Sequence, residues 1–272
     1  MNYRHAFHAG NFGDCVKHAV LVWLLRALQR KPASLFVLDT HAGAGRYDLT
    51  DGPAMRTGEW QKGIARLADD PPPALDDYVG VVRSLGLYPG SPAIVRALLR
   101  PGDRLACCEL HAEDAAALRR LFAHDPQVAV HRRDAWEALG ALLPPAERRG
   151  LVLVDPPFED PQEFAELARG LATGWQRFRT GVFAAWYPIK QRAPVRQLHA
   201  DLRQSGIRDV VVAEFCLREP VDAARLNGCG IAVVNPPYRF EQEVPAILEA
   251  LRTRLGDREP GEAASVTRIV DE

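Results

Sequence analysis

The chain has 272 residues, of which 47% are hydrophobic and 25% are charged, and its formal net charge is −1. This length fits one large domain, or a domain with an insertion, with a sizeable core. The near-neutral charge argues against a protein that coats a polyanion over its whole surface, but it does not exclude a local basic face. The five cysteines have no C-x-x-C spacing, so neither a zinc site nor a redox motif is indicated.

The first residues, MNYRHAFHAG, do not resemble a signal peptide, and no apolar run approaches the length needed to span a membrane. Reduced thiols in a cytoplasmic protein are the simplest interpretation of the cysteines. We therefore expect a cytoplasmic monomer that has no membrane partner and no metal.

The first elements are a helix and a buried strand. Apolar residues at helical spacing predict a helix over 14–30, and Lys31-Pro32 should end it. The apolar run at 35–39 predicts a buried strand. The next strand, at 104–110, does not begin until about 60 residues later, which is about twice the ~30 residues that a βα crossover needs. Something must be inserted between these two strands.

The inserted stretch is predicted to be helical. Two amphipathic helices are expected at 57–68 and 73–86, and a third begins with Ser91 as N-cap and Pro92 in the first turn. We assign 1–50 and 90–272 to the main domain, with the first helix binding the cofactor, and 51–89 to an inserted helical subdomain.

Strands and helices alternate through the rest of the chain, which favours a doubly wound parallel sheet of seven strands. Residues 218–229 are too short for a helix, so the last two strands should form an antiparallel hairpin at the sheet edge. Six parallel strands and a reversed last strand resemble the class I S-adenosylmethionine (SAM) methyltransferases. The later strands are expected at 104–110, 128–134, 151–155, 181–187, 209–217 and 230–235. The helices between them are expected at 112–123, 135–143, 161–173 and 194–205. A helix at 241–255 and a tail end the chain.

Polar residues follow four of the strands at the edge where such folds bind ligands. Gly43 and Gly45 follow the first strand, Glu109 ends the second, Asp134 the third and Asp155 the fourth. Glu109 suits a ribose diol and Asp134 an adenine amine. Each acid alone could be a surface residue or a helix cap, and the two glycines alone could form any tight turn. A dinucleotide fold is disfavoured because Asp48 stands where G-x-G-x-x-G needs its third glycine.

Two similar motifs compete for the catalytic role: VDPPF (154–158) and VNPPY (234–238). The strand before Asp155 is predicted to end on the ligand side. The strand before Asn235 is predicted to be reversed, which puts NPPY at the opposite edge of the sheet, tens of ångströms away on the scale of strand lengths. There its prolines would block further pairing of an edge strand.

The sequence also resembles a known family. DTHAGAG is similar to motif I, and DPPF to the catalytic motif, of amino-methyltransferases. YRHAFHAGNFGDCVKH, DTHAGAGRY, YPGSP, CELH and RRGLVLVDPPF together resemble the RlmJ family of 23S ribosomal RNA adenine-N6 methyltransferases over nearly the whole chain.

The resemblance implies SAM as the cofactor and assigns roles to individual residues. Lys17 would reach the methionine carboxylate, although a lysine at the head of an apolar stripe is usually a snorkelling surface residue. Tyr3 would touch the RNA, and Asp155 is the catalytic acid. Phe158 departs from the family, which usually has Tyr there. The implied cofactor contacts are His18, His41, Ser91, Glu109, Asp134, Ala135 and Asp155.

The residues of DPPF suit methylation of an exocyclic amine. Asp155 and the Pro156 carbonyl can each accept one N6–H, which aims the lone pair of the amine at the methyl group, while Phe158 stacks on a base drawn out of its helix or loop. Four cationic residues in or beside the insertion are expected either to contact RNA phosphates or to form a solvated face: Arg46, Arg56, Lys62 and Arg66.

We therefore predict a SAM-dependent methyltransferase that acts on adenine N6 in 23S ribosomal RNA, either free or in an early assembly particle. Within the same chemistry, the alternative is a DNA amino-methyltransferase, although no DNA-reading domain is recognisable. A non-catalytic RNA-binding or ribosome-assembly factor on the same fold is the alternative from another class. A nucleotide-dependent oxidoreductase is disfavoured by the missing third glycine.

Overall fold

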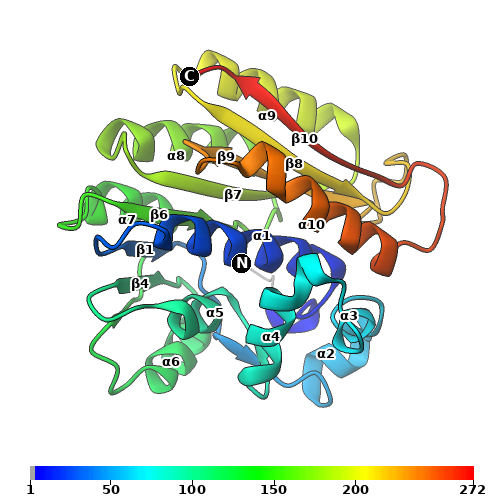
Figure 1. Ribbon diagram of the computed structural model, residues 1–272, viewed down its shortest axis with the longest axis horizontal. Helices are drawn as coiled ribbons and strands as arrows, with labels where there is room; N and C mark the ends of the chain where they lie inside the picture. The colour runs from blue at the N-terminus through cyan, green and yellow to red at the C-terminus, as the bar shows by residue number, and fades with distance from the viewer. Residues whose placement is uncertain (1–3) are drawn as a thin grey trace.

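An eight-stranded sheet runs through the middle of the molecule in the computed structural model, which describes residues 4–272 (Figure 1). Buried apolar residues fill its central strands. In spatial order, the strands are β10 (Ala263–Val270), β8 (Val210–Cys216), β9 (Gly228–Val234), β7 (Val182–Ile189), β6 (Gly150–Val154), β1 (Phe36–Asp39), β4 (Arg104–Cys108) and β5 (Val128–His131).

The strand directions confirm the predicted fold class, with two corrections. Strands β5, β4, β1, β6 and β7 are parallel neighbours, and β9 is antiparallel to both β7 and β8. The sheet has eight strands rather than seven, because residues 263–270 of the expected tail form β10 against β8. The side chains of β10 largely alternate between exposed and half-buried, a period-two pattern that the sequence analysis overlooked. The hairpin of β8 and β9 is therefore inside the sheet and not at its edge.

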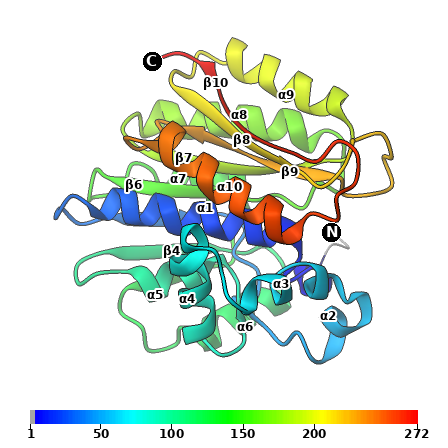
Figure 2. The same ribbon diagram turned by 45° about the vertical axis from the view of Figure 1, so that its right-hand side comes forward.

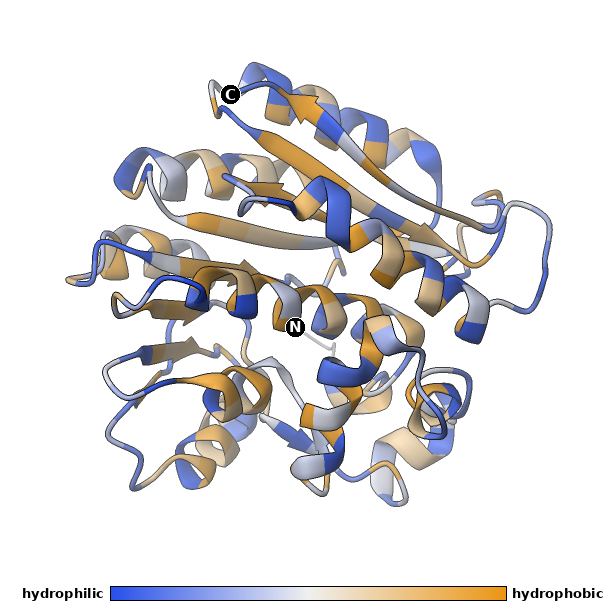
Figure 3. Cartoon of the chain, in the orientation of Figure 1, coloured by the Kyte–Doolittle hydropathy of each residue, from blue (hydrophilic) through white to orange (hydrophobic). Residues whose placement is uncertain are grey.

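Helices cover both faces of the sheet, as the two views in Figures 1 and 2 show. Each helix turns an apolar stripe toward the strands, so that hydrophobic colour concentrates in the middle layer (Figure 3). No helix between residues 4 and 272 is long and apolar enough to cross a membrane. One layer contains α1 (Phe12–Gln29), α5 (Ser91–Leu98), α6 (Ala112–Leu121) and α10 (Phe240–Leu255), and the other contains α7 (Ala135–Leu142), α8 (Glu163–Arg177) and α9 (Arg192–Gln204).

The stretch between β1 and α5 consists of short helical segments beside α1 and α10. The single helix expected over 57–68 is broken at Gly63, where a Cβ atom would lie 2.0 Å from the Gly10 carbonyl oxygen. Ser91 is the first residue of α5, and Gly90 is its N-cap. The segments are β2 (Arg46–Tyr47), α2 (Gly52–Thr57), η2 (Glu59–Lys62), α3 (Ala65–Ala68), η3 (Pro73–Leu75), α4 (Asp76–Ser84) and β3 (Tyr88–Pro89), which pairs with β2.

The NPPY motif lies at the edge of the sheet opposite to Asp155, as the topology predicts. Val154 pairs with Ala185 of β7, and Val234 pairs with Phe183 of the same strand, so Asp155 and Asn235 extend the two registers to positions 186 and 182. Four residues of strand correspond to about 13 Å, and the two strand spacings across β7 add about 10 Å sideways, so the separation is roughly 16 Å rather than tens of ångströms. The prolines do not protect an edge strand, because β9 is paired on both sides.

Asn235 has a structural role in this turn. Its backbone has a left-handed φ of 51°, and its side-chain amide donates hydrogen bonds to the carbonyls of Arg179 (2.8 Å) and Gly181 (2.7 Å). Asparagine tolerates this backbone conformation better than most residues. Asn235 therefore ties the start of β7 to the end of β9.

We expect Asn235→Ala to destabilise the protein by about 2 kcal/mol, because two hydrogen bonds are lost and alanine is strained at positive φ. The methyl transfer expected from the sequence should stay close to wild type in the folded variant. Urea unfolding and an activity assay give the two values. Tyr238→Ala is the control, since 85% of the Tyr238 side chain is exposed and its removal should change neither value.

Candidate active site

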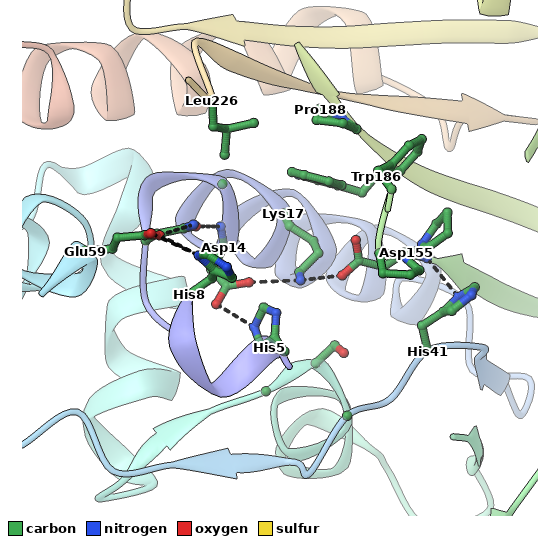
Figure 4. A pocket seen from close by; sticks show the side chains of 18 of the residues that line it. His5, His8, Asp14, Lys17, His41, Glu59, Asp155, Trp186, Pro188 and Leu226 are labelled. Atoms are coloured by element: carbon green, nitrogen blue, oxygen red, sulfur yellow. Dashed lines mark hydrogen bonds and ion pairs between the residues drawn. The ribbon is translucent and has the colours of Figure 1, made fainter. Parts of the chain in front are cut away.

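A cavity of about 650 Å³ opens at the carboxyl edge of the sheet. Asp155 and Lys17 lie in its middle (Figure 4). One side, which we call the β4 side, is lined by residues that follow β1, β4 and β5: His41, Gly43, Glu109, Leu110, Arg133, Asp134 and Ala135. The other, the β7 side, is lined by residues of β7, of the β8–β9 connection and of the insertion: Glu59, Lys62, Trp186, Pro188, Lys190, Arg218, Arg225 and Leu226.

Glu109 is held in place by the loop after β1. Its two carboxylate oxygens accept hydrogen bonds from the backbone N–H groups of Gly43 (2.8 Å) and His111 (2.7 Å). Gly43 has a φ of 61°, and a Cβ there would lie 2.4 Å from the Tyr47 hydroxyl. Burial raises the pKa of Glu109, while the two N–H groups oppose this rise. The result is a fixed carboxylate with lone pairs left to accept from a ligand diol.

Two histidines on the cavity wall are neutral at neutral pH. Burial lowers the pKa of His18 to about 3 and that of His41 to about 4. Nδ1 of His18 lies 3.1 Å from the Tyr88 hydroxyl, and its buried Nε2 has no partner among residues 4–272. A buried, unpaired nitrogen is unfavourable unless a ligand supplies its partner. His18 and the buried Ser91 both line the cavity.

Asp39, the last residue of β1, does not line the cavity but lies directly before the lining residues Thr40 and His41, and the sequence analysis did not select it. It is fully buried, and burial raises its pKa to about 6. Its Oδ2 has no hydrogen-bond partner within the described part of the chain. The sequence did contain a signal for Asp39, because an acid at the end of a buried strand, next to a glycine turn, is a common place for a functional residue.

Asp134 caps α7 and also lines the cavity. Its Oδ1 accepts hydrogen bonds from the N–H groups of Trp136 (2.9 Å) and Glu137 (3.1 Å). The helix-cap interpretation is therefore correct for one oxygen. Both bonds use Oδ1, so Oδ2 can accept from a ligand amine, and Ala135 lies beside it on the wall.

Lys17 joins two carboxylates in the middle of the cavity. Its ammonium lies 2.6 Å from Asp155 Oδ2 and 2.9 Å from Asp14 Oδ1, and only 6% of its side chain is exposed. Burial alone would lower the pKa of Lys17, but the charges of Asp14 and Asp155 raise it well above the usual value. Lys17 is thus not a snorkelling residue. It pairs with Asp14 and Asp155, and its contact with a methionine carboxylate stays a prediction.

Asp14 extends this chain of contacts to the N-terminal segment. It accepts from the Gly10 N–H (2.9 Å), and its Oδ2 lies 3.0 Å from His5 Nε2. The Asn11 side chain caps α1 by accepting from the Asp14 N–H. Burial opposes ionisation of Asp14, but His5 and Lys17 lower its pKa well below the usual range. The start of α1 is therefore fixed against Asp155 by charge as well as by packing.

The DPPF loop places an aromatic ring beside Asp155. The Asp155 N–H donates to His41 Nδ1 (3.3 Å), and Pro156, Pro157 and Phe158 line the cavity. Phe158 has a left-handed φ of 53°, and its ring centroid lies 4.8 Å from that of Phe164 and 6.0 Å from that of Trp186. An aromatic residue in this conformation is uncommon and marks a loop whose shape is fixed by its surroundings.

Some predicted site residues lie elsewhere. Gly45 does not line the cavity: a Cβ there would come within 2.8 Å of Leu118 and Leu121 of α6, so its role is close packing. Arg46 and Arg56 are exposed outside the cavity. Lys62 lines the rim, whereas Arg66 is committed to Asp257 (2.7 Å) and to the Leu255 carbonyl (3.0 Å). Tyr3 lies outside the described residues.

Sequence reasoning missed most of the β7 side. It stopped at Asp155, although Lys190 directly follows β7 and residues 217–226 connect β8 to β9 at the same edge. The strand-end rule that found Glu109 and Asp155 would have found Lys190. Between residues 4 and 272, no three His, Cys, Asp or Glu side chains come together as a metal site would require.

The sequence of the chain is similar to a known family and to two named proteins. The family model described as "RsmJ: Ribosomal RNA large subunit methyltransferase D, RlmJ" matches residues 32–269. The chain belongs to the RlmJ family. This RlmJ-family chain is 40% identical to "Ribosomal RNA large subunit methyltransferase J" of Escherichia coli (strain K12), with all of both chains covered. It is 38% identical to the protein of the same name from Haemophilus influenzae, with 94% of each chain covered.

A solved structure supports the fold of the RlmJ-family chain. The crystal structure of protein LPL1258 from Legionella pneumophila is similar with a TM-score of 0.87 and 34% identity, over 96% of this chain and 98% of the other. The resemblance to the RlmJ family, noted from DTHAGAG, DPPF and the N-terminal motif, is thereby confirmed.

Proposed function

We propose that this chain transfers a methyl group from SAM to the N6 amine of an adenine in 23S ribosomal RNA. Its membership of the RlmJ family and the names of its full-length relatives support this function. The observation that carries it is the place of Asp155, between a side of the cavity that suits an adenosyl group and a side walled by apolar rings.

The residues on the β4 side fit SAM. Glu109 offers a fixed carboxylate to the ribose hydroxyls, and the second oxygen of Asp134 suits the adenine amine. His18 has a buried nitrogen without a partner among residues 4–272, and Ser91 lines the wall. Gly43 lines the cavity and avoids a collision with the Tyr47 hydroxyl, so the loop that holds Glu109 keeps its shape. His18 and His41 would act as neutral hydrogen-bonding groups, since both pKa values lie far below 7.

The target amine is a weak nucleophile because its lone pair is delocalised into the adenine ring. SAM supplies an electrophilic methyl group, so the protein's task is to free and aim that lone pair. The Asp155 carboxylate accepts one N6–H, and the Pro156 carbonyl accepts the other. Lys17 orients the Asp155 carboxylate through its 2.6 Å contact. Most of the rate enhancement then comes from positioning.

The target base must leave its helix or loop to reach Asp155. Phe158 provides a flat ring for stacking. Trp186, Pro188 and Leu226 form an apolar wall on one side of Lys17 and Asp155 (Figure 4). Stacking on one aromatic ring contributes about 1–3 kcal/mol. The ring alone is needed for this contact, so Phe158 can replace the tyrosine that is usual at this position.

We assign RNA contacts to the stretch 51–89, which acts as an inserted helical subdomain. Lys62 on the cavity rim and the exposed Arg56 are its candidate phosphate contacts, together with the exposed Arg46, which precedes the stretch. For Tyr3, the RNA contact rests on the family resemblance alone. Arg66 is better explained by its ion pair with Asp257. The protein works as a cytoplasmic monomer on free 23S RNA or on an early assembly particle.

The test is incubation of the purified protein with labelled SAM and 23S RNA from a strain that lacks the relative's gene, followed by mapping of the modified nucleoside. N6-methyladenosine at one position is the expected product. Label in duplex DNA but not in RNA would favour the DNA methyltransferase, and label in neither, with RNA still bound, would favour a non-catalytic RNA-binding protein.

Glu109→Ala should weaken SAM binding about tenfold to a hundredfold, because hydrogen bonds between a carboxylate and hydroxyls are lost. Isothermal titration calorimetry measures the affinity, and thermal unfolding checks that the variant is folded. Glu137→Ala is a matched control, since Glu137 is exposed on α7 and does not line the cavity. Equal affinity of Glu109→Ala and wild type would remove Glu109 from the site.

A further inference from the structure

Two cations on the β7 side of the cavity have no role in the function proposed so far. Lys190 directly follows β7, and Arg225 lies in the β8–β9 connection; both are exposed and line the cavity. Continuing the register from Val154–Ala185, Asp155 is level with Trp186, so Lys190 lies four residues further along. That is about 13 Å beyond the catalytic carboxylate, toward the mouth.

A buried asparagine joins the segments that carry these cations. Asn227 is fully buried, and its backbone N–H donates to the Ile189 carbonyl (3.1 Å). Its side-chain amide donates to the Lys190 carbonyl (2.8 Å) and to the Asp222 carbonyl (2.7 Å). The backbone of Lys190 and the β8–β9 connection are therefore held as one unit, which suits a binding site built on fixed backbone.

The neighbouring charges are already compensated. Arg218 makes two 2.9 Å contacts with Glu259, which leaves Arg225 only a 3.8 Å contact with the same carboxylate. Glu59 accepts from Asn11 and pairs with His8, and Asp257 pairs with Arg66. Glu214 pairs with Arg192, and no ion pair within 4.0 Å involves Lys190 among residues 4–272. Lys190 is therefore unpaired among the described residues, and Arg225 and Lys62 keep only long contacts of 3.8 Å and 4.0 Å with carboxylates.

We propose that Lys190 and Arg225 form a phosphate-binding pair that holds the RNA backbone next to the target adenosine. This inference rests on the proposed function and extends it to the substrate's backbone. The apolar wall of Trp186, Pro188 and Leu226 lies along the same side as the two cations. A base turned toward Asp155 along this wall leaves its flanking phosphodiesters at the mouth, where the two cations stand. Phosphate contacts of this kind position a nucleic acid without reading its sequence.

The experiment measures binding of in-vitro-transcribed 23S RNA at several salt concentrations for Lys190→Gln, Arg225→Gln and the double variant. Each lost phosphate contact should reduce the slope of log K against log salt by about 0.7–0.9, and the double variant should bind about tenfold or more weakly at low salt. SAM affinity should be unchanged, and the methylation rate at saturating RNA should stay near wild type while KM rises.

Lys31→Gln and Arg208→Gln are matched controls, because both residues are exposed at the opposite edge of the sheet and should leave the slope unchanged. Lys190→Arg and Arg225→Lys keep the charge and should restore it. A wild-type slope in the double variant would overturn the inference, as would weaker binding with an unchanged slope, since that would mean a disturbed loop. If wild-type protein binds RNA but methylates none, the proposed function fails, while the slopes still test the pair.

Discussion

Asp155→Ala is expected to lose nearly all methyl transfer while SAM and RNA still bind. In the proposed mechanism, the side chain supplies the acceptor for the target amine. Its removal also leaves the buried Lys17 ammonium with Asp14 as its one carboxylate contact among residues 4–272. Asp155→Asn keeps a carbonyl at this position and should retain partial activity. A single assay of methyl transfer, with thermal unfolding as the check on folding, compares these variants.

The ring of Phe158 is tested in the same assay. Phe158→Tyr should remain active, and Phe158→Ala should lose roughly tenfold to a hundredfold from weaker stacking. Asn235→Ala is the control for motif identity, since it lies at the opposite edge of the sheet. Loss of turnover in folded Asn235→Ala, with activity kept in Asp155→Ala, would mean that the site has been assigned to the wrong motif.

Lys17→Met should reduce methyl transfer strongly, as Asp155→Ala does, but for a different reason. Methionine fills a comparable volume but leaves Asp14 and Asp155 without the cation between them. Removing one partner from a buried ion pair costs roughly 3–5 kcal/mol. We expect a loss of stability on that scale. Separately, we expect turnover to fall by about a hundredfold or more, because Asp155 loses the group that orients it.

Urea unfolding and single-turnover methylation separate these two effects of Lys17. Lys17→Arg retains the charge and should recover much of the stability. If Lys17→Met weakened SAM binding strongly but left single-turnover methylation at saturating SAM unchanged, Lys17 would be a methionine-carboxylate contact instead of the partner of Asp155.

Much of the fold follows from the sequence because strand and helix signals alternate clearly from 104 to 255. The strand β10 was missed because its residues are exposed or half-buried on an edge, where apolar patterning is weak. The insertion was predicted to be helical, but the break at Gly63 depends on contact with Gly10, more than fifty residues earlier. Local patterns carry no information about such a contact.

The same limit applies to the site. Acids at the ends of parallel strands could be placed together from topology alone, and the cavity does bring Glu109, Asp134 and Asp155 to one edge. The partner of Lys17 could not be predicted, because Asp155 is 138 residues away in the chain. The role of Asn227 could not be predicted for a related reason. It donates hydrogen bonds to three carbonyls that come together only in the folded chain.

The edge strand β10 has a practical consequence for handling the protein. It runs antiparallel to β8, whose carboxyl end is at the cavity, so the last residues emerge at the far edge, where the Asp209 N–H donates to the Asp271 carbonyl. An affinity handle or fluorophore fused after Glu272 therefore points away from the cavity mouth. Immobilising the protein through this end would leave the RNA-facing opening accessible to a sensor's flow, which suits the salt titrations described above.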